Sequence, residues 1–323
     1  MRSTHPKILT ILDPTSLLGR GVAERIARSL PQVRRRMFHT AEEQEHLIAE
    51  VAEEAALVPP LASPDDLDGS DAVLVTAQPS AATCGLLLDW LRRHPSVALL
   101  DCTQPGIAGS EACCVADRLP AERPARPWYH LADPALAAPF RFVAALAPLE
   151  PEALHLTVVC PVAARGAEAL DELAAQGATR LSGHPMHRPD RLPAVLAFDL
   201  APAGSGRSAG LEAQLGELFP QLECRVHAID AGVFHGYLAT VLVRCGAMPS
   251  PQRLRSLVRA TADIRLAQTN KVLTTTEAVE RGSVIVCGDL QAKGNWVSAW
   301  LLADGLAVGN DAVMELLSSL NAC

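Results

Sequence analysis

Hydrophobic positions in the first third of the chain alternate between short apolar runs and longer amphipathic stretches. The run KILTIL at 7–12 predicts a strand, and the stretch at 17–30 has apolar residues at helical spacing. A strand pattern at 71–77, a helical stretch at 81–93 and an apolar run at 97–102 repeat this alternation. Strands that alternate with helices predict a doubly wound α/β domain, whose parallel sheet is covered on both faces. Ligands of such domains bind at the carboxyl ends of the strands.

The pattern changes in the middle of the chain. Residues 106–139 are rich in Pro, Arg and Ala and lack clear periodicity, which indicates a crossing between two domains. A helix at 140–146 then leads into long apolar runs separated by helical stretches, which predict an α+β domain with a mostly antiparallel sheet. The segment APAGSGRSAG at 201–210 has the composition of a surface loop. A final helix at 297–320 is expected to pack on the first domain.

Composition excludes several classes of partner. The net charge of −8 argues against nucleic acid, because phosphate binding needs a basic face. No window reaches the ~18 apolar residues of a membrane span. Residues 1–7 lead into a strand and not into a signal-peptide core, which favours the cytoplasm.

The cysteine and histidine patterns predict neither disulfides nor a metal site. The nine cysteines are odd in number and include no C-x-x-C pair, and most lie in apolar runs such as TVVCPV. Buried free thiols explain this pattern. The ten histidines show no metal-ligand spacing.

Five segments in order carry a resemblance to a known family. They are FVAALAPLEP (142–151), VCPVAARGAEALDELAAQ (159–176), LAFDLAP (196–202), GVFHGYLATV (232–241) and VCGDLQAKGNWVSAWLLADGL (286–306). Together they resemble the aspartate-semialdehyde dehydrogenases over nearly the whole chain, and they are most similar to the catalytically degenerate Usg-type paralogues.

This resemblance implies a fold class and domain bounds. A Rossmann-like, NAD(P)-binding-type domain is expected over 1–135, completed by a C-terminal helix at 296–323. An α+β dimerisation and substrate-type domain is expected over 136–295.

The resemblance also implies where the catalytic residues should lie. The family attacks its substrate with a cysteine thiolate, because a thiolate is both a good nucleophile and a good leaving group. Here the nucleophile position is Ala137, the histidine position is Tyr237, and the glutamine position is Cys160. The arginine that clamps the substrate carboxylate corresponds to Asp230, which would repel a carboxylate. The catalytic set is therefore expected to be lost.

The nucleotide-binding turn also departs from the family pattern. The family uses glycines so that backbone N–H groups approach the pyrophosphate at a helix N-terminus. Here Asp13 places a carboxylate in the turn, and Pro14 lacks an N–H donor. Gly19 is expected to serve helix–strand packing, and Thr15 or Ser16 to cap the helix. The vestigial cofactor positions are Thr15, Ser16, Leu18, Gly19, Lys293 and Gly294, the last two at the expected start of the final helix.

Three functions remain open from the sequence. The first is a dimeric structural or regulatory paralogue without dehydrogenase activity or cofactor, paired with itself or with a related dehydrogenase through the strands at 233–243 and 283–287. The second is an active NADP-dependent semialdehyde dehydrogenase of amino-acid biosynthesis with relocated residues. Its candidate catalytic pair is Cys160 with His235, and His235 is expected to share one strand face with Tyr237. The third is a sensor that binds a metabolite without turnover.

A loop could also bring one of the first-domain cysteines to the old substrate pocket. These thiols, Cys102, Cys113 and Cys114, lie in or after a first-domain strand.

Overall fold

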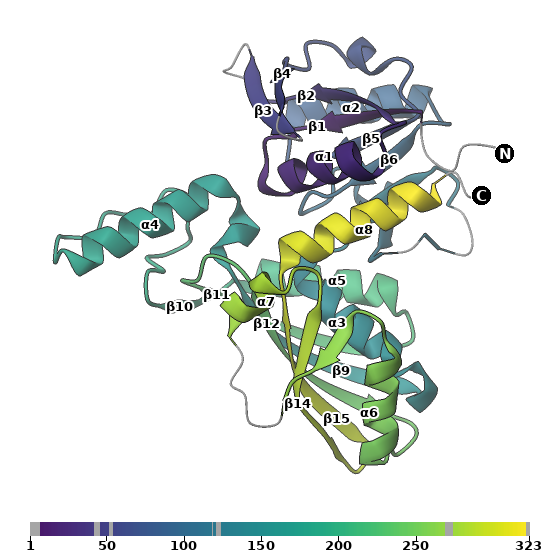
Figure 1. The fold of residues 1–323 in the computed structure, drawn as a ribbon, viewed down its shortest axis with the longest axis vertical. Helices are drawn as coiled ribbons and strands as arrows, with labels where there is room; N and C mark the ends of the chain where they lie inside the picture. The colour runs from purple at the N-terminus through teal and green to yellow at the C-terminus, as the bar shows by residue number, and fades with distance from the viewer. Residues whose placement is uncertain are drawn as a thin grey trace. The chain divides into compact units, whose positions relative to one another are not determined.

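The computed structural model describes residues 7–41, 46–51, 54–117, 119–120, 124–268 and 274–320. The chain divides into two compact units (Figure 1). Unit 1 comprises Met1–Asp133 with Gly309–Cys323, and unit 2 comprises Pro134–Val308.

Unit 1 contains a six-stranded parallel sheet in the order β2-β1-β5-β6-β8-β7. Apolar side chains on one sheet face pack with helix α1 and the last turns of α8, while those on the other face pack with α2. Both faces are therefore covered, which confirms the doubly wound α/β class. The elements are β1 (Ile8–Leu12), α1 (Leu17–Ser29), β2 (Arg34–Phe38), β3 (Leu47–Val51), β4 (Glu54–Val58), β5 (Ala72–Val75), α2 (Ala81–Arg93), β6 (Ala98–Asp101), β7 (Cys113–Val115) and β8 (Trp128–Leu131).

Unit 2 contains a seven-stranded mixed sheet in the order β10-β11-β9-β12-β15-β14-β13. Only the β11–β9 and β13–β14 pairs are parallel, so the sheet is mostly antiparallel as predicted. The elements are α3 (Pro134–Ala145), β9 (Pro151–Cys160), α4 (Ala167–Leu181), β10 (Leu200–Pro202), α5 (Ser205–Leu218), β11 (Glu223–Ala231), β12 (Tyr237–Cys245), α6 (Pro251–Ala260), β13 (Ile264–Leu266), α7 (Thr275–Glu280), β14 (Ile285–Lys293) and β15 (Trp296–Ala303), followed by α8 (Gly305–Ser319), which continues into unit 1.

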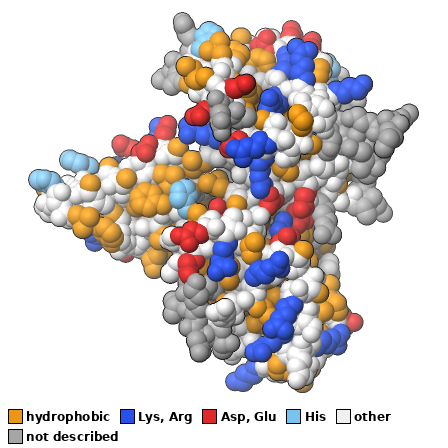
Figure 2. Space-filling model, in the orientation of Figure 1, with side chains coloured by type: hydrophobic (Ala, Val, Ile, Leu, Met, Phe, Trp, Pro, Cys, Tyr) orange, Lys and Arg blue, Asp and Glu red, His pale blue; other side chains and the backbone are white. Residues whose placement is uncertain are grey.

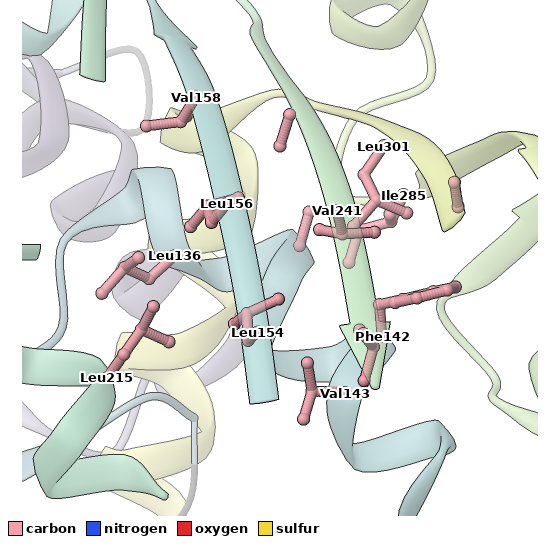
Figure 3. Packing of buried hydrophobic residues seen from close by; sticks show 14 of the residues in the cluster. Leu136, Phe142, Val143, Leu154, Leu156, Val158, Leu215, Val241, Ile285 and Leu301 are labelled. Atoms are coloured by element: carbon pink, nitrogen blue, oxygen red, sulfur yellow. The ribbon is translucent and has the colours of Figure 1, made fainter. Parts of the chain in front are cut away.

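The core of unit 2 lies on one face of this sheet. Alternate residues of β9, such as Leu154 and Leu156, point to one side, because strand side chains alternate in direction. Figure 3 shows them packed against Phe142 and Val143 of α3 and Leu215 of α5. Residues on the other side of the strands are more exposed, including Leu242 (40%) and Trp300 (43%).

The structure corrects four sequence-based predictions of local structure in whole or in part. The helix expected at 140–146 already begins at Pro134, because proline fits the first turn of a helix, where its missing N–H has no partner to lose. The expected crossing at 106–139 contains the division between the units, after Asp133, but it also contains β7 and β8. The expected loop at 201–210 forms the end of β10 and, from Ser205, helix α5. The expected helix over 296–323 is a strand, β15, as far as Ala303, and its helical part begins at Gly305.

Candidate functional site

The turn after β1 confirms two of the sequence-based assignments. Ser16 caps α1, with its hydroxyl oxygen accepting a hydrogen bond from the Gly19 N–H at 3.0 Å. Gly19 is needed for close packing, because a Cβ there would lie 2.6 Å from the Asp13 carbonyl oxygen and 2.7 Å from the Thr76 hydroxyl. Thr15 contributes a carbonyl that accepts from Arg20, and Leu18 packs against the unit 1 core. Both Ser16 and Gly19 therefore have a structural role that needs no nucleotide.

Asp13 occupies the residue directly after β1 in a left-handed conformation, with φ of 58°. Its carboxylate accepts hydrogen bonds from the backbone N–H and the hydroxyl of Thr40, both at 2.8 Å. Burial raises the pKa of the Asp13 carboxyl above its usual range, while the Thr40 hydrogen bonds and nearby His39 act in the opposite direction. The carboxylate thus ties the end of β1 to the segment after β2.

Lys293 and Gly294 do not lie at the start of the last helix. Lys293 ends β14, and Gly294, with φ of 62°, forms the turn into β15. This corrects their sequence-based placement. The error arose because a β-hairpin and a strand-to-helix turn both favour glycine at such a position.

Three of the four positions that the sequence resemblance assigns to catalytic residues lie together on the sheet of unit 2. Cys160 at the end of β9 is the register partner of Asp230 in β11. Leu238 of β12 pairs with Val159, which places Tyr237 beside Cys160 on the core face.

The fourth position, Ala137, lies in α3, and the first residue of this helix approaches Tyr237. The Tyr237 ring lies against Gly305, where a Cβ would overlap the ring and approach the Cβ of Pro134. Ala137 is one turn further along α3 from Pro134 and packs against the unit 2 core. Because the resemblance predicts that these positions have lost the family's catalytic residues, we call Ala137, Cys160, Asp230 and Tyr237 the degenerate site.

Charge at the degenerate site is neutralised from within the chain. The Arg165 guanidinium donates to the Asp230 carboxylate with an Nη2–Oδ2 distance of 2.6 Å. The Asp230 side chain is 8% exposed and that of Arg165 is 34% exposed. Arg165 was missed by sequence reasoning, because no motif marks an arginine in the short 3-10 turn Val162–Arg165.

The fallback pair of Cys160 and His235 is not assembled as expected. His235 precedes β12, and the strand starts only at Tyr237. Gly236 between them has φ of 85°, so the period-two rule that placed His235 and Tyr237 on one strand face does not apply. Cys160 is only 1% exposed.

The described part of the chain contains no cluster of three or more His, Cys, Asp or Glu residues that could hold a metal ion. Within the same residues, no helix is long and apolar enough to cross a membrane.

No protein-family model matches the sequence, and no curated relative matches it either. Solved structures do match. Aspartate semialdehyde dehydrogenase II from Vibrio cholerae, complexed with ASA, aligns with a TM-score of 0.82 at 16% identity, covering 96% of this chain and 97% of that one. The chain has the aspartate-semialdehyde dehydrogenase fold.

Two further solved structures align over nearly the whole chain. A probable aspartate-semialdehyde dehydrogenase from Pseudomonas aeruginosa gives a TM-score of 0.81 at 21% identity, with 96% and 97% of the two chains covered. The Candida albicans enzyme with NADP gives 0.71 at 11% identity, with 98% and 99% covered. These TM-scores establish the fold of this chain. Because the sequence identities are low, its chemistry must be argued from its own residues.

Proposed function

We propose that this protein is a non-catalytic, Usg-type relative of the aspartate-semialdehyde dehydrogenases that acts as a structural or regulatory partner. The observation that carries the proposal is the content of the degenerate site. The resemblance assigns the nucleophile position to Ala137, whose side chain is a methyl group, and the carboxylate of Asp230 is paired with Arg165. Acyl transfer of the family's type needs a thiolate and a base within hydrogen-bond reach of each other.

The buried aspartate supports the loss of substrate binding as well. A substrate carboxylate would have to displace Asp230 from Arg165 and leave that carboxylate buried without a cation. Because Arg165 is 34% exposed, water screens part of the interaction, and losing the cation should cost about 2–3 kcal/mol. The degenerate site therefore favours its own internal ion pair over an external anion.

The turn after β1 supports the absence of a bound dinucleotide. The Gly19 N–H already donates to Ser16, Pro14 has no N–H, and Asp13 adds a carboxylate where a pyrophosphate would need donors. These residues do not fit NADP. The alternative of an active enzyme with relocated residues would require this turn to bind a dinucleotide. It would also require the buried Cys160 to attack a substrate.

A partner role is supported by exposed apolar side chains in unit 2. Leu242 and Trp300 lie on the open face of the sheet, and their strands pair directly. Figure 2 shows a second group of hydrophobic side chains on α4 and the segment after it, where Leu181, Phe198 and Leu200 are 79%, 68% and 63% exposed. Exposed apolar patches of this kind are typical of interaction surfaces. The open sheet face is proposed as the surface that pairs with a second copy or with a related dehydrogenase.

The catalytic part of the proposal is tested by titrating purified protein with NADP⁺ and NAD⁺ in a calorimeter, with a parallel assay of phosphate-dependent oxidation of aspartate semialdehyde. Neither binding nor turnover is expected, and Ala137→Cys alone should restore neither. Turnover by the unmodified protein that Cys160→Ala abolishes would overturn the proposal and make Cys160 a relocated nucleophile.

The partner part is tested by light scattering of the unmodified protein, Trp300→Glu and Leu181→Glu. We expect a dimer that Trp300→Glu dissociates and Leu181→Glu leaves intact. A monomer in the unmodified protein, in the absence and presence of a related dehydrogenase, would contradict it.

A further inference from the structure

Three side chains with complementary chemistry line adjacent strands of unit 1. Asp101 ends β6, His130 lies in β8, and Cys114 lies in the edge strand β7. The register pairs Asp101 with His130 and His130 with Cys114. Neighbouring strands are about 4.8 Å apart, so the three residues form a row across the sheet. The row lies at the carboxyl ends of parallel strands, where doubly wound domains bind ligands.

The three side chains project from the same face of the sheet. Leu99 and Trp128, two residues before Asp101 and His130, belong to the core cluster beneath α2. Cys113 and Tyr129 belong to the cluster on the opposite face. Because strand side chains alternate, Cys114 faces the same side as His130 and Asp101, while Cys113 faces away from them.

His130 is held in one tautomer. Its Nε2 lies 3.0 Å from the carbonyl oxygen of Thr103, and because a carbonyl only accepts, Nε2 carries the proton. In the neutral ring Nδ1 is then the acceptor, and none of the described residues donates to it. A neutral imidazole with an open acceptor nitrogen can take a proton from a neighbouring thiol.

Asp101 supplies the negative charge that would stabilise the protonated ring. Its side chain is fully buried, and its carboxylate accepts from the Thr103 N–H at 3.0 Å and from the Ile107 N–H at 2.6 Å. A Cβ added at Gly106 would lie 2.9 Å from two ring carbons of His130 and 3.0 Å from Asp101 Oδ2. The ring and the carboxylate therefore meet over this glycine.

The other described thiols are poor candidates for reaction. Burial raises the pKa of Cys224 to about 11 and that of Cys287 to about 12, and it raises the pKa of Cys84, Cys102 and Cys245 as well. Cys160 is 1% exposed. Cys113 directs its thiol to the Cys114 carbonyl oxygen at 3.7 Å and away from His130. Cys114 is partly exposed and lies beside an imidazole.

We propose that Cys114, His130 and Asp101 form a reactive-thiol site that takes small, uncharged, electrophilic carbon compounds. The Cys114 proton passes to His130 Nδ1, and Sγ attacks the electrophilic carbon. With an aldehyde, the carbonyl electron pair moves to oxygen, which takes the proton back from His130 to give a thiohemiacetal without net oxidation. The Asp101 charge disfavours anionic reagents. The inference does not rest on the proposed loss of dehydrogenase activity, which concerns unit 2 and the turn after β1.

The site is tested by alkylating the native full-length protein with iodoacetamide and following each cysteine by peptide mass spectrometry. Iodoacetamide gives a stable thioether with release of iodide. Cys323 lies outside the described residues, so Cys323→Ser serves as the background. An ordinary thiol with a pKa of about 8.5 is only about 3% ionised at pH 7, so an effective proton acceptor can raise its reactivity by up to about 30-fold.

We expect Cys114 to react about tenfold faster than every other cysteine at pH 7. His130→Gln keeps an N–H that can donate to Thr103. It should slow the reaction of Cys114 about tenfold at pH 7 and leave its rate unchanged at pH 10, where the thiol ionises unaided. Cys113→Ser is the matched control and should leave the rate unchanged. Equal labelling of Cys113 or Cys84, or an undiminished rate in His130→Gln, would overturn the inference.

A separate count with a chromogenic disulfide reagent covers the case in which His130→Gln does not fold. Cys114→Ser should lose the fast-reacting thiol, while Cys113→Ser should retain it. A fast thiol that persists in Cys114→Ser contradicts the proposal whatever the behaviour of the histidine variant.

Discussion

The ion pair between Arg165 and Asp230 allows a quantitative test of the degenerate site. Arg165→Ala would leave the Asp230 carboxylate, 8% exposed, without its cation. Removing one partner of a fully buried pair costs about 3–5 kcal/mol. Because Arg165 is itself 34% exposed, water screens part of the interaction, and we expect about 2–3 kcal/mol. Asp230→Ala should cost only about 1 kcal/mol, since the guanidinium it releases can be hydrated.

Hydrogen exchange of peptides from β9 and β11, followed by mass spectrometry, measures this loss locally. At tenfold per 1.4 kcal/mol, Arg165→Ala should speed exchange in these strands by about 30- to 150-fold and Asp230→Ala by about fivefold. Peptides from unit 1 provide the internal reference. Arg225→Ala is the matched control on β11, because its pair with Glu212 is 59% and 35% exposed and should be worth under ~1 kcal/mol.

The double variant decides whether the two residues act as a pair. Arg165→Ala with Asp230→Ala removes the stranded carboxylate, so its exchange should be slower than that of Arg165→Ala alone. Equal effects of the two single changes, or a double variant that shows their simple sum, would refute the view that Asp230 is a buried charge neutralised by Arg165.

Two further predictions concern the turn after β1. Gly19→Ala should destabilise unit 1 by about 1–3 kcal/mol in thermal melts, through overpacking against the Asp13 carbonyl oxygen. The control Gly85→Ala, with open space around it in α2, should be neutral or stabilising. Equal effects of the two changes would contradict the packing role of Gly19. Asp13→Asn tolerates positive φ and can keep both contacts with Thr40. Because the folded-state pKa of Asp13 is raised, the wild type loses stability as pH rises from the ordinary value through the folded one, and Asn escapes this loss. In urea unfolding, the free energy of unfolding of Asp13→Asn should therefore increase relative to that of the wild type between pH 4 and pH 7. A relative decrease with rising pH would show that the carboxylate charge is favourable there.

Sequence reasoning succeeded where a local physical rule fixes the residue type. The sequence narrowed the helix cap to Thr15 or Ser16, because a helix start needs an acceptor for its free N–H groups, and Ser16 is the cap. Gly19 was assigned correctly, because close helix–strand packing leaves no space for a Cβ. The buried strands at 7–12 and 71–77 were recognised for the same reason, since apolar runs of this length bounded by turns favour strands.

It failed where distant parts of the chain decide the structure. The apolar run at 296–303 fits a helix as well as a buried strand, and only its pairing with β12 and β14 selects the strand. Arg165 could not be assigned to the degenerate site because 65 residues separate it from Asp230. The row of Cys114, His130 and Asp101 is likewise visible only through strand register, which no spacing in the sequence encodes.

Both departures from the dehydrogenase pattern share one physical feature. The sequence resemblance assigns Asp13 and Asp230 to positions where the enzyme's chemistry calls for a donor or a cation. Each carboxylate is satisfied by its own chain, through Thr40 and Arg165. A buried carboxylate that lacked such partners would destabilise the fold by several kcal/mol. The Thr40 and Arg165 contacts therefore keep both carboxylates compatible with the fold. Under the proposed function, these contacts let the chain keep the fold of a dehydrogenase while its nucleophile and anion sites are lost.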